Sequence, residues 1–367
     1  MYFSTQREPF LRALTQVVNV VERRQTAPVL ANLLVQVQDG SLTLTGTDTE
    51  VEMCSRIRLD KFEKGETTIP ARKLFEIVRS LPDAIDISLS QKDDKVTLQA
   101  GRSRFTLASL PVAEFPVANT LQGGQRVQIP EDQLKELFER TAFAMAQQDV
   151  RFYLNGLLID VVGDGTLSCV ATDGHRLATF QVSLGTMSEE KRQLIVPRKG
   201  VMELQRLLEN VDASVELEIA PTHIRVNKGE VTFTSKLIDG RFPDYHSVIP
   251  IGLDLQVLVH RENFKTALQR VAILTNEKYR GVRLDIEKNQ IIITAHNPNQ
   301  EEAHEEIEAQ SNIHSLTISF NVNYLLDALH ALRGEEVMLQ LRDAQSSMLL
   351  REGETASAQH VIMPLHL

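Results

Sequence analysis

Two stretches of the sequence hold residue types that could do acid–base or metal chemistry. Asp173 and His175 stand two residues apart in the string ATDGHRLA (171–178), and His304 lies in an acidic run. A carboxylate beside an imidazole could serve a hydrolase, and a histidine among carboxylates could bind a metal ion. Residues two apart in a strand or turn share no convergent geometry without third partners, and none is evident. Asp173-Gly174 is also a common hairpin turn, in which His175 would be an ordinary turn residue.

Other catalytic patterns are missing from the sequence. It has no glycine-rich phosphate loop, no G-x-S-x-G, no H-E-x-x-H and no cysteine cluster. Cys54 and Cys169 lie far apart in apolar or alternating stretches, which predicts free, buried thiols. We therefore expect no catalytic residue, metal or cofactor, and an enzyme such as a DNA-processing hydrolase is the least favoured class of function.

The composition is that of a globular protein, with 367 residues of which 42% are hydrophobic. No run of about 18 apolar residues occurs, and the N-terminus lacks the features of a signal peptide. We expect a cytoplasmic protein without a membrane segment. The net charge of −10 argues at first against nucleic acid. Affinity for phosphate comes from local Lys and Arg, however, so the distribution of charge decides.

Three segments of the chain repeat one pattern, in which an amphipathic helix runs into a β-hairpin. The hairpin turn keeps register, since Thr47-Asp48, Thr172-Asp173 and His296-Asn297 follow one another at intervals of about 125 residues. The apolar helix faces are Phe10, Leu11, Leu14, Val17, Val18 and Val21 in the first segment, Leu134, Leu137, Phe138 and Met145 in the second, and Phe264, Leu268, Val271 and Ala272 in the third.

A second helix follows in each copy, over residues 72–81, 198–208 and 321–333. The first two copies then end at a Phe-Pro corner (115–116 and 242–243), and the third ends at Val361-Ile362-Met363-Pro364. These landmarks predict domains at 1–122, 123–251 and 252–367. The grouping of helices and strands favours the α+β class, with three tandem domains, each a sheet with two helices on one face.

The exposed helix faces carry basic residues at equivalent places. Arg12, Lys135 and Lys265 each follow the leading apolar residue of the first helix of their copy. One such face is usually just solvated, but the same sign on three equivalent faces indicates a shared electrostatic task. Further basic residues of these helices are Arg7, Arg140, Arg270, Arg72, Lys73, Arg79, Arg198, Lys199, Arg206 and Arg333.

Helix packing gives a geometric test of a ring around duplex DNA. Helices pack about 10 Å apart and are about 10 Å thick, so a ring lined by about twelve has a free bore of about 28 Å. One chain supplies about six helices, which leave about 9 Å, less than the roughly 12 Å width of the major groove alone. Two chains therefore fit around a duplex, and one does not.

Four strings of the sequence closely resemble the β subunits of bacterial DNA polymerase III, the family of replication sliding clamps. They are ATDGHRLA (171–178), RFYLNG (151–156), FPDY (242–245) and VIMPL (361–365). The resemblance covers all three copies and the length. It implies a head-to-tail homodimer of six like domains with helices lining the hole. It also implies a non-catalytic role in processivity, and as partners duplex DNA bound without sequence preference, the polymerase III catalytic subunit, the clamp loader, other DNA polymerases and repair proteins.

The resemblance also implies a cleft for partner peptides between the second and third domains. Ser247 and His366 stand where enterobacterial members carry basic residues, which concerns peptide preference rather than the site itself. Carried over residue by residue, the cleft comprises Arg151, Leu154, Thr172, Gly174, His175, Arg176, Leu177, Pro243, Val248, Val361, Met363, Pro364 and Leu365. Residues for DNA are Arg24, Gln148 and Tyr153 by family match, with Arg12, Lys135, Lys265, Arg72 and Arg198 from the helix faces.

The dimer seam implied by the resemblance joins the third copy of one chain to the first copy of the other. Ile273 and Leu274 would meet Phe105 and Leu107 of the partner chain, while Arg102 and Arg104 would lie opposite Glu301, Glu302, Glu305 and Glu306. The alternative is a repeat-built scaffold that binds proteins without encircling DNA.

Overall fold

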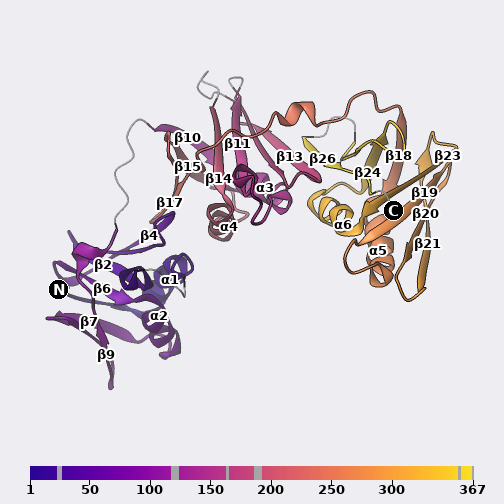
Figure 1. The fold of residues 1–367 in the computed structure, drawn as a ribbon. Coiled ribbons are helices and arrows are strands. Elements are labelled where there is room, and N and C mark those ends of the chain that lie inside the picture. The colour runs from indigo at the N-terminus through magenta and orange to yellow at the C-terminus, as the bar shows by residue number, and fades with distance from the viewer. Residues whose placement is uncertain (23–26, 117–123, 163–164, 186–191, 354–356, 366–367) are drawn as a thin grey trace. The chain divides into compact units, whose positions relative to one another are not determined.

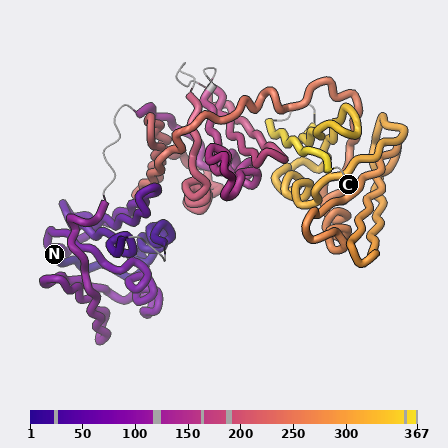
Figure 2. The backbone as a smooth tube through the Cα atoms, viewed as in Figure 1, coloured from indigo at the N-terminus to yellow at the C-terminus, as the bar shows by residue number. Residues whose placement is uncertain are grey.

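The computed structural model describes residues 1–22, 27–116, 124–162, 165–185, 192–353 and 357–365 (Figures 1 and 2). The chain packs as two compact units. Unit 1 comprises residues 1–132 and 202–237, and unit 2 comprises residues 133–201 and 238–367. In the described parts of the chain, no helix is long and apolar enough to cross a membrane.

The repeat is confirmed as one order of elements that occurs three times. Each copy runs strand, helix, three-strand meander, strand, helix, three-strand meander. The first copy has β1 (Tyr2–Gln6), α1 (Arg7–Val18), β2 (Asn32–Gln38), β3 (Ser41–Thr47), β4 (Val51–Arg58), β6 (Gly65–Pro70), α2 (Ala71–Ser80), β7 (Asp86–Lys92), β8 (Lys95–Ala100) and β9 (Ser103–Ala108), with a short extra strand β5 (Lys61–Glu63) and the 3-10 turns η1 (Pro28–Ala31) and η2 (Val112–Glu114).

The second and third copies follow the same order. The second has β10 (Gln125–Pro130), α3 (Glu131–Glu139), η3 (Ala142–Ala144), η4 (Phe152–Leu154), β11 (Gly156–Val162), β12 (Thr166–Thr172), β13 (Arg176–Ser183), β14 (Arg192–Pro197), α4 (Arg198–Leu207), β15 (Ser214–Ile219), β16 (His223–Lys228), β17 (Val231–Lys236) and η5 (Tyr245–Ser247). The third has β18 (Leu255–His260), α5 (Arg261–Val271), η6 (Ala272–Leu274), β19 (Gly281–Glu287), β20 (Gln290–His296), β21 (Glu302–Glu308), β22 (Gln310–Ser311), β23 (Ser315–Asn321), α6 (Val322–Ala331), β24 (Glu336–Leu341), β25 (Met348–Arg351) and β26 (Ala358–Ile362).

The described strands form four antiparallel sheets, two in each unit. Unit 1 holds β5-β1-β7-β8-β9 and the longer sheet β10-β15-β16-β17-β4-β3-β2-β6. Unit 2 holds β14-β11-β12-β13-β26-β25-β24-β18-β22 and the smaller sheet β21-β20-β19-β23. The α+β class is therefore confirmed, but the strands of one copy divide between two sheets.

Two seams join neighbouring copies by strand pairing. In unit 1, β4 of the first copy pairs with β17 of the second, with Met53 opposite Phe233. In unit 2, β13 of the second copy pairs with β26 of the third, with Ala178 opposite His360 (Figure 1). The third pair of equivalent strands, β21 and β9, lies at the edges of two different sheets.

In the first and third copies the two helices pack on strands of both sheets to which the copy contributes, since α1 also contacts β1, α5 contacts β18 and α6 contacts β26. α1 and α2 pack on each other and on β2, β3, β4 and β6. α5 and α6 likewise pack on each other and on β20, β21 and β23. Phe10, Leu14 and Val17 of α1 are buried, as are Phe264 and Leu268 of α5. The apolar periodicity of the sequence therefore marks the sides of the helices that face the sheets.

The helix ends differ from the sequence-based bounds. The helix over Leu134 and Phe138 ends at Glu139, so Met145 lies beyond it, after η3. Val21 similarly follows α1, which ends at Val18. Both side chains are nevertheless buried, because the turns that follow the helices pack on the same cores. Apolar spacing alone therefore extended both helices too far.

Other predictions are met only in part. Both cysteines are free, but only Cys169 is fully buried. Burial raises the pKa of the Cys54 thiol to about 12. The proposed boundary at 122 lies outside the described residues, and the one at 251 falls in a segment without regular structure between η5 and β18. The domain limits stay predictions.

Candidate functional site

An apolar cluster in unit 2 collects many of the residues predicted for the cleft. Leu154, Leu177 and Val361 are buried in it together with Phe242 and Tyr245. Leu177 and Val361 lie opposite each other in the paired strands β13 and β26. The second seam thus brings the ATDGHRLA string and the chain's last strand into one core.

Exposed apolar residues border this cluster. Val248 and Met363 are each 48% exposed, and Pro243 is exposed beside the buried Phe242. The backbone N–H of Met363 donates to the carbonyl of His175 at 3.0 Å, and that of Leu365 donates to Ser319 at 2.7 Å. These bonds hold the C-terminal segment against the turn after β12, with Pro364 and Leu365 half-buried.

The turn from Thr172 to Arg176 is fixed by its own side chains. The Thr172 hydroxyl donates to the carbonyl of Arg176 at 2.6 Å, and the Asp173 carboxylate accepts from the backbone N–H groups of His175 and Arg176. Gly174 has φ +88°, and a Cβ there would lie 2.8 Å from a guanidinium nitrogen of Arg151. Glycine suits both the left-handed backbone and the close approach of Arg151.

Arg176 is committed to contacts within the chain. Its guanidinium donates to Asp173 at 3.1 Å, to Asp327 at 2.5 Å and to the carbonyl of Phe143 at 2.9 Å. It also lies over the ring of Tyr324, with 4.5 Å to the centroid. Its side chain is only 12% exposed. Arg176 therefore ties the turn to α6, and sequence reasoning missed Tyr324 and Asp327 because their proximity is tertiary.

Arg151 remains the accessible arginine beside the turn. Its side chain is 46% exposed and pairs with Asp149 at 2.9 Å. Hydrogen bonds from Arg151 lower the pKa of Asp149 to about 2, so this carboxylate stays ionised at neutral pH. An acidic or polar group of a ligand can reach Arg151 from solvent.

The hydrolase and metal interpretations find no support in the described residues. The Asp173 carboxylate is engaged with backbone amides and Arg176, and no hydrogen bond to the His175 ring is present among the described contacts. His304 contacts Glu306 at 3.1 Å on an exposed strand face. In the same described ranges no group of three or more His, Cys, Asp and Glu could hold a metal ion.

The helix residues that were predicted to contact DNA differ in their exposure and in their contacts within the chain. Arg12 on α1 is exposed. Lys135 and Lys265 are 20% exposed and pair with Glu139 at 3.8 Å and Glu262 at 3.2 Å. Arg72 donates to the carbonyl of Val21 and Arg198 to that of Met145.

The residues for DNA carried over from the family lie elsewhere. Gln148 is exposed with φ +57°, and Tyr153 packs against the apolar cluster and edge-on to Phe152. Arg24 lies outside the described residues.

Several other basic helix residues are structural. Arg7 is 9% exposed and donates to the carbonyls of Val78 and Arg79. Arg140 pairs with Glu136 at 2.8 Å and Glu352 at 3.0 Å. Arg270 makes a bidentate pair with Glu305. The basic face is therefore narrower than the sequence suggested.

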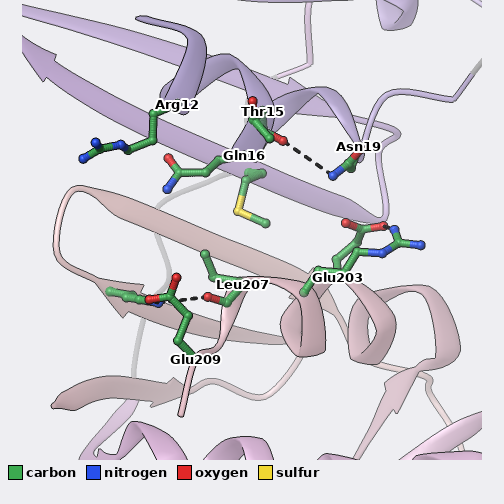
Figure 3. A pocket seen from close by; sticks show the side chains of 10 residues that line it. Arg12, Thr15, Gln16, Asn19, Glu203, Leu207 and Glu209 are labelled. Carbon is green, nitrogen blue, oxygen red and sulfur yellow. Dashed lines mark hydrogen bonds and ion pairs between the residues drawn. The ribbon is translucent and has the colours of Figure 1, made fainter. Parts of the chain in front are cut away.

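A polar pocket of about 450 Å³ lies beside Arg12 in unit 1, between α1 and the end of α4 (Figure 3). Arg12, Thr15, Gln16 and Asn19 line its α1 side. The opposite side is formed by Glu203, Arg206, Leu207, Glu209 and Lys228, and Met53 completes the lining.

The equivalent place at the second seam is closed by ion pairs. Counting from the first residue of each helix, Arg12 and Gln16 of α1 correspond to Glu136 of α3 and to Arg140, which follows α3. Lys135 and Lys265 therefore correspond to Leu11 and not to Arg12, so the sequence-based equivalence of the three basic residues was wrong. At the second seam, Arg333 contacts Glu136 at 3.2 Å and Glu139 at 3.1 Å, and Arg140 contacts Glu352. The junction between copies therefore contains a pocket in unit 1, whereas the equivalent junction in unit 2 is closed by ion pairs.

The residues predicted for the dimer seam lie on two sheet edges and on η6. Phe105 and Leu107 on β9 are half-buried, and Arg102 and Arg104 beside them are exposed. Ile273 on η6 is 77% exposed, and Leu274 is half-buried. Glu301, Glu302 and Glu306 are exposed at β21, whereas Glu305 is half-buried and held by Arg270.

Comparison with known proteins gives matches along the whole chain. The family models of the DNA polymerase III beta subunit match in tandem: the N-terminal domain over residues 1–119, the central domain over 128–244 and the C-terminal domain over 246–366. The chain is 48% identical to the beta sliding clamp of Pseudomonas aeruginosa and 45% identical to that of Escherichia coli, over 100% of each chain. The crystal structure of the DNA polymerase III subunit beta from Pseudomonas aeruginosa matches with a TM-score of 0.97 at 48% identity, again over 100% of both chains.

Proposed function

The chain belongs to the DNA polymerase III beta subunit family, the beta sliding clamps, and from this membership we propose that two copies close head-to-tail into a ring around duplex DNA. The ring acts in the cytoplasm and tethers the replicative polymerase, the clamp loader and other polymerases and repair proteins. Its contribution is mechanical rather than catalytic. A scaffold that binds only proteins is not favoured by the relatives, which are sliding clamps.

The proposal of ring closure rests on β9 and β21, which are edge strands of their sheets. In both seams of the chain, the last strand of a copy's first meander pairs with the last strand of the next copy's second meander. β21 and β9 are the remaining strands of these two kinds. Edge strands offer unpaired backbone groups to a further strand. A second copy of the chain supplies the missing partner for each edge, which closes the ring after two subunits.

The register of the proposed seam is taken from the first seam, between β4 and β17. Glu52, Leu177 and Glu302 occupy the same hairpin position, since each pairs with the last residue of the preceding strand. Phe105 and Phe233 are likewise equivalent. The Met53–Phe233 pair therefore predicts Ala303 opposite the partner's Phe105, and His304 opposite the partner's Arg104.

A disulfide across this register tests the ring. Directly opposed residues of an antiparallel pair have Cβ atoms about 4.5–5.5 Å apart, close to the range that a disulfide spans. Arg104→Cys with His304→Cys should give a covalent dimer on mild oxidation. The matched pair Arg104→Cys with Glu306→Cys is two residues out of register and should remain mostly uncrosslinked. Equal crosslinking of both pairs, or of neither, would contradict the proposed seam.

DNA contact in this proposal is electrostatic and independent of sequence, through Arg12, Lys135, Lys265, Arg72 and Arg198, with Arg24, Gln148 and Tyr153. A sliding protein cannot keep hydrogen bonds to base edges, because each would break at every step. Arg12→Ala should weaken binding equally for unrelated duplexes and reduce the salt slope by about one. Arg283→Ala, on β19, is the control. A strong preference of the protein for one duplex sequence would contradict the proposal.

The partner site of this proposal is the exposed apolar surface of Val248, Met363 and Pro243 over the cluster of Leu177 and Val361. Short peptides bind through a few buried anchors, and a flexible methionine can repack around unlike ones. Deleting residues 363–367 should abolish binding of a fluorescent polymerase-tail peptide while the dimer persists. Ile251→Ala removes an equally apolar residue, 86% exposed, and should leave affinity unchanged. Undiminished affinity of the truncated protein would place the peptide elsewhere.

A further inference from the structure

A buried carboxylate lies behind the partner surface and belongs to none of the residues predicted for it. Asp160 on β11 is 7% exposed. It lies two residues beyond Leu158, so both side chains are on the same face of the strand, and Leu158 is part of the apolar cluster. A carboxylate in such a place is costly unless hydrogen bonds compensate its lost hydration.

Two donors meet one oxygen of Asp160. The Tyr245 hydroxyl donates to Oδ2 at 3.0 Å, and the side-chain amide of Gln193 donates to the same atom at 3.1 Å. Burial and the neighbouring carboxylate raise the pKa of Tyr245, so the phenol keeps its proton and remains a donor at neutral pH.

Tyr245 begins η5, the turn that lies between Pro243 and Val248 in the chain. Within the turn, Asp244 accepts from the backbone N–H of His246 at 3.2 Å, and the N–H of Val248 donates to the carbonyl of Tyr245 at 3.1 Å. These bonds shape the turn but do not attach it to the sheet. The Tyr245–Asp160 hydrogen bond is a polar attachment of the turn to β11, and it adds to the packing of Phe242, Tyr245 and Ile249 in the apolar cluster.

We infer that Asp160 is a positioning residue for partner binding: through Tyr245 it sets Pro243 and Val248 at a fixed place over Leu177 and Val361. The two donors have different consequences. Tyr245 connects the carboxylate to the partner surface, whereas Gln193 belongs to β14 and carries no residue of that surface. Losing either donor costs the carboxylate one hydrogen bond, but only loss of the tyrosine hydroxyl removes a bond between the turn and β11.

The inference rests on the proposed partner site, and the experiment separates the two. A fluorescein-labelled peptide copied from the C-terminal tail of a bacterial polymerase III catalytic subunit is titrated against the full-length protein. If the unsubstituted protein does not bind the peptide, the proposed site fails. If it binds, Tyr245→Phe should lower affinity about tenfold, mainly through faster dissociation, while Gln193→Ala leaves it unchanged.

A second pair of variants tests the carboxylate itself. Asp160→Asn keeps an oxygen that accepts from Tyr245 and should retain most of the affinity, whereas Asp160→Leu should lose as much as Tyr245→Phe. Thermal unfolding measured on all four variants reports any general loss of stability. Unchanged peptide affinity in Tyr245→Phe, or equal losses in Tyr245→Phe and Gln193→Ala, would overturn the positioning role.

Discussion

Lowering the pH should weaken unit 2 through one buried histidine, His360 on β26. The residue is 1% exposed, and neither ring nitrogen has a hydrogen-bond partner among the described residues. Its ring lies 5.5 Å from that of Phe143. Burial, and then the positive charges of Arg140 and Arg176, lower the pKa of His360 to about 3. The imidazole is therefore neutral in the folded protein.

The sign and size of the effect follow from that pKa. The ordinary histidine pKa is about 6.5, so below pH 6.5 the unfolded chain binds a proton that the folded chain does not. Stability is then lost as the pH falls, by about 1.4 kcal/mol per pH unit, until the folded pKa near 3 is reached. Between pH 7 and pH 5 the loss from His360 is about 2 kcal/mol.

His360→Leu removes this titration with little change in volume. Ala178, which lies opposite His360, has the same hairpin position as Met53, and the residue opposite Met53 is the buried Phe233, so an apolar side chain suits this place in a seam. The variant also removes two unpaired nitrogens, and should be about 1–3 kcal/mol more stable at pH 7. Urea midpoints measured between pH 5 and pH 8 test both effects. His330→Gln, at an exposed position on α6, is the control. Equal pH dependence of unfolding in the unsubstituted protein and His360→Leu would refute the reasoning.

Three further predictions concern the junctions and the seam. Lys228 contacts Glu131 at 2.7 Å, and the side chain of Glu131 is 1% exposed. Lys228→Met should therefore lower the free energy of unfolding, measured with urea, by about 3–5 kcal/mol, and adding Glu131→Leu should restore most of the loss. No recovery in the double variant would show that the ion pair is not the cause. Native-state hydrogen exchange should be faster for the backbone amides that follow Thr15 in α1, beside the pocket of unit 1, than for those that follow Glu139, beside the ion pairs of unit 2. Equal protection of the two sets of amides would contradict this contrast. Ile273→Ala with Leu274→Ala should give monomers by light scattering, whereas Glu302→Gln should leave the dimer intact. Burying a large apolar side chain contributes about 1.5–3 kcal/mol, and an exposed ion pair contributes about 0–1 kcal/mol. A dimer of the double alanine variant that persists at micromolar protein would contradict the assignment of the seam.

The repeat was predictable because its signals are local. Helical spacing of apolar residues and the regular return of a polar turn appear within short windows of sequence. The buried faces of α1 and α5 bear this out. The seams were not predictable in the same way, since pairing of β13 with β26 joins strands that are distant along the chain.

The candidate site also has a part that could be predicted from local sequence and a part that depends on tertiary contacts. The residue types of the turn Thr172–Arg176 pointed to it, but sequence could not tell that Arg151 stays accessible while Arg176 is enclosed by Tyr324 and Asp327. The sequence gives the sign of each charge, whereas the partner of each charge depends on the tertiary structure. Asp160 gave no signal, because an aspartate in an apolar strand has no pattern of its own.

Topological retention on DNA tests the central claim most directly. The protein is loaded onto a nicked circular duplex with a clamp loader and passed through a gel-filtration column in moderate salt, before and after the circle is cut once by a restriction enzyme. A closed ring should stay with the circle and be lost from the linear form, because it slides off the ends. Equal retention on both forms, or loss from both, would contradict encirclement of DNA by this chain.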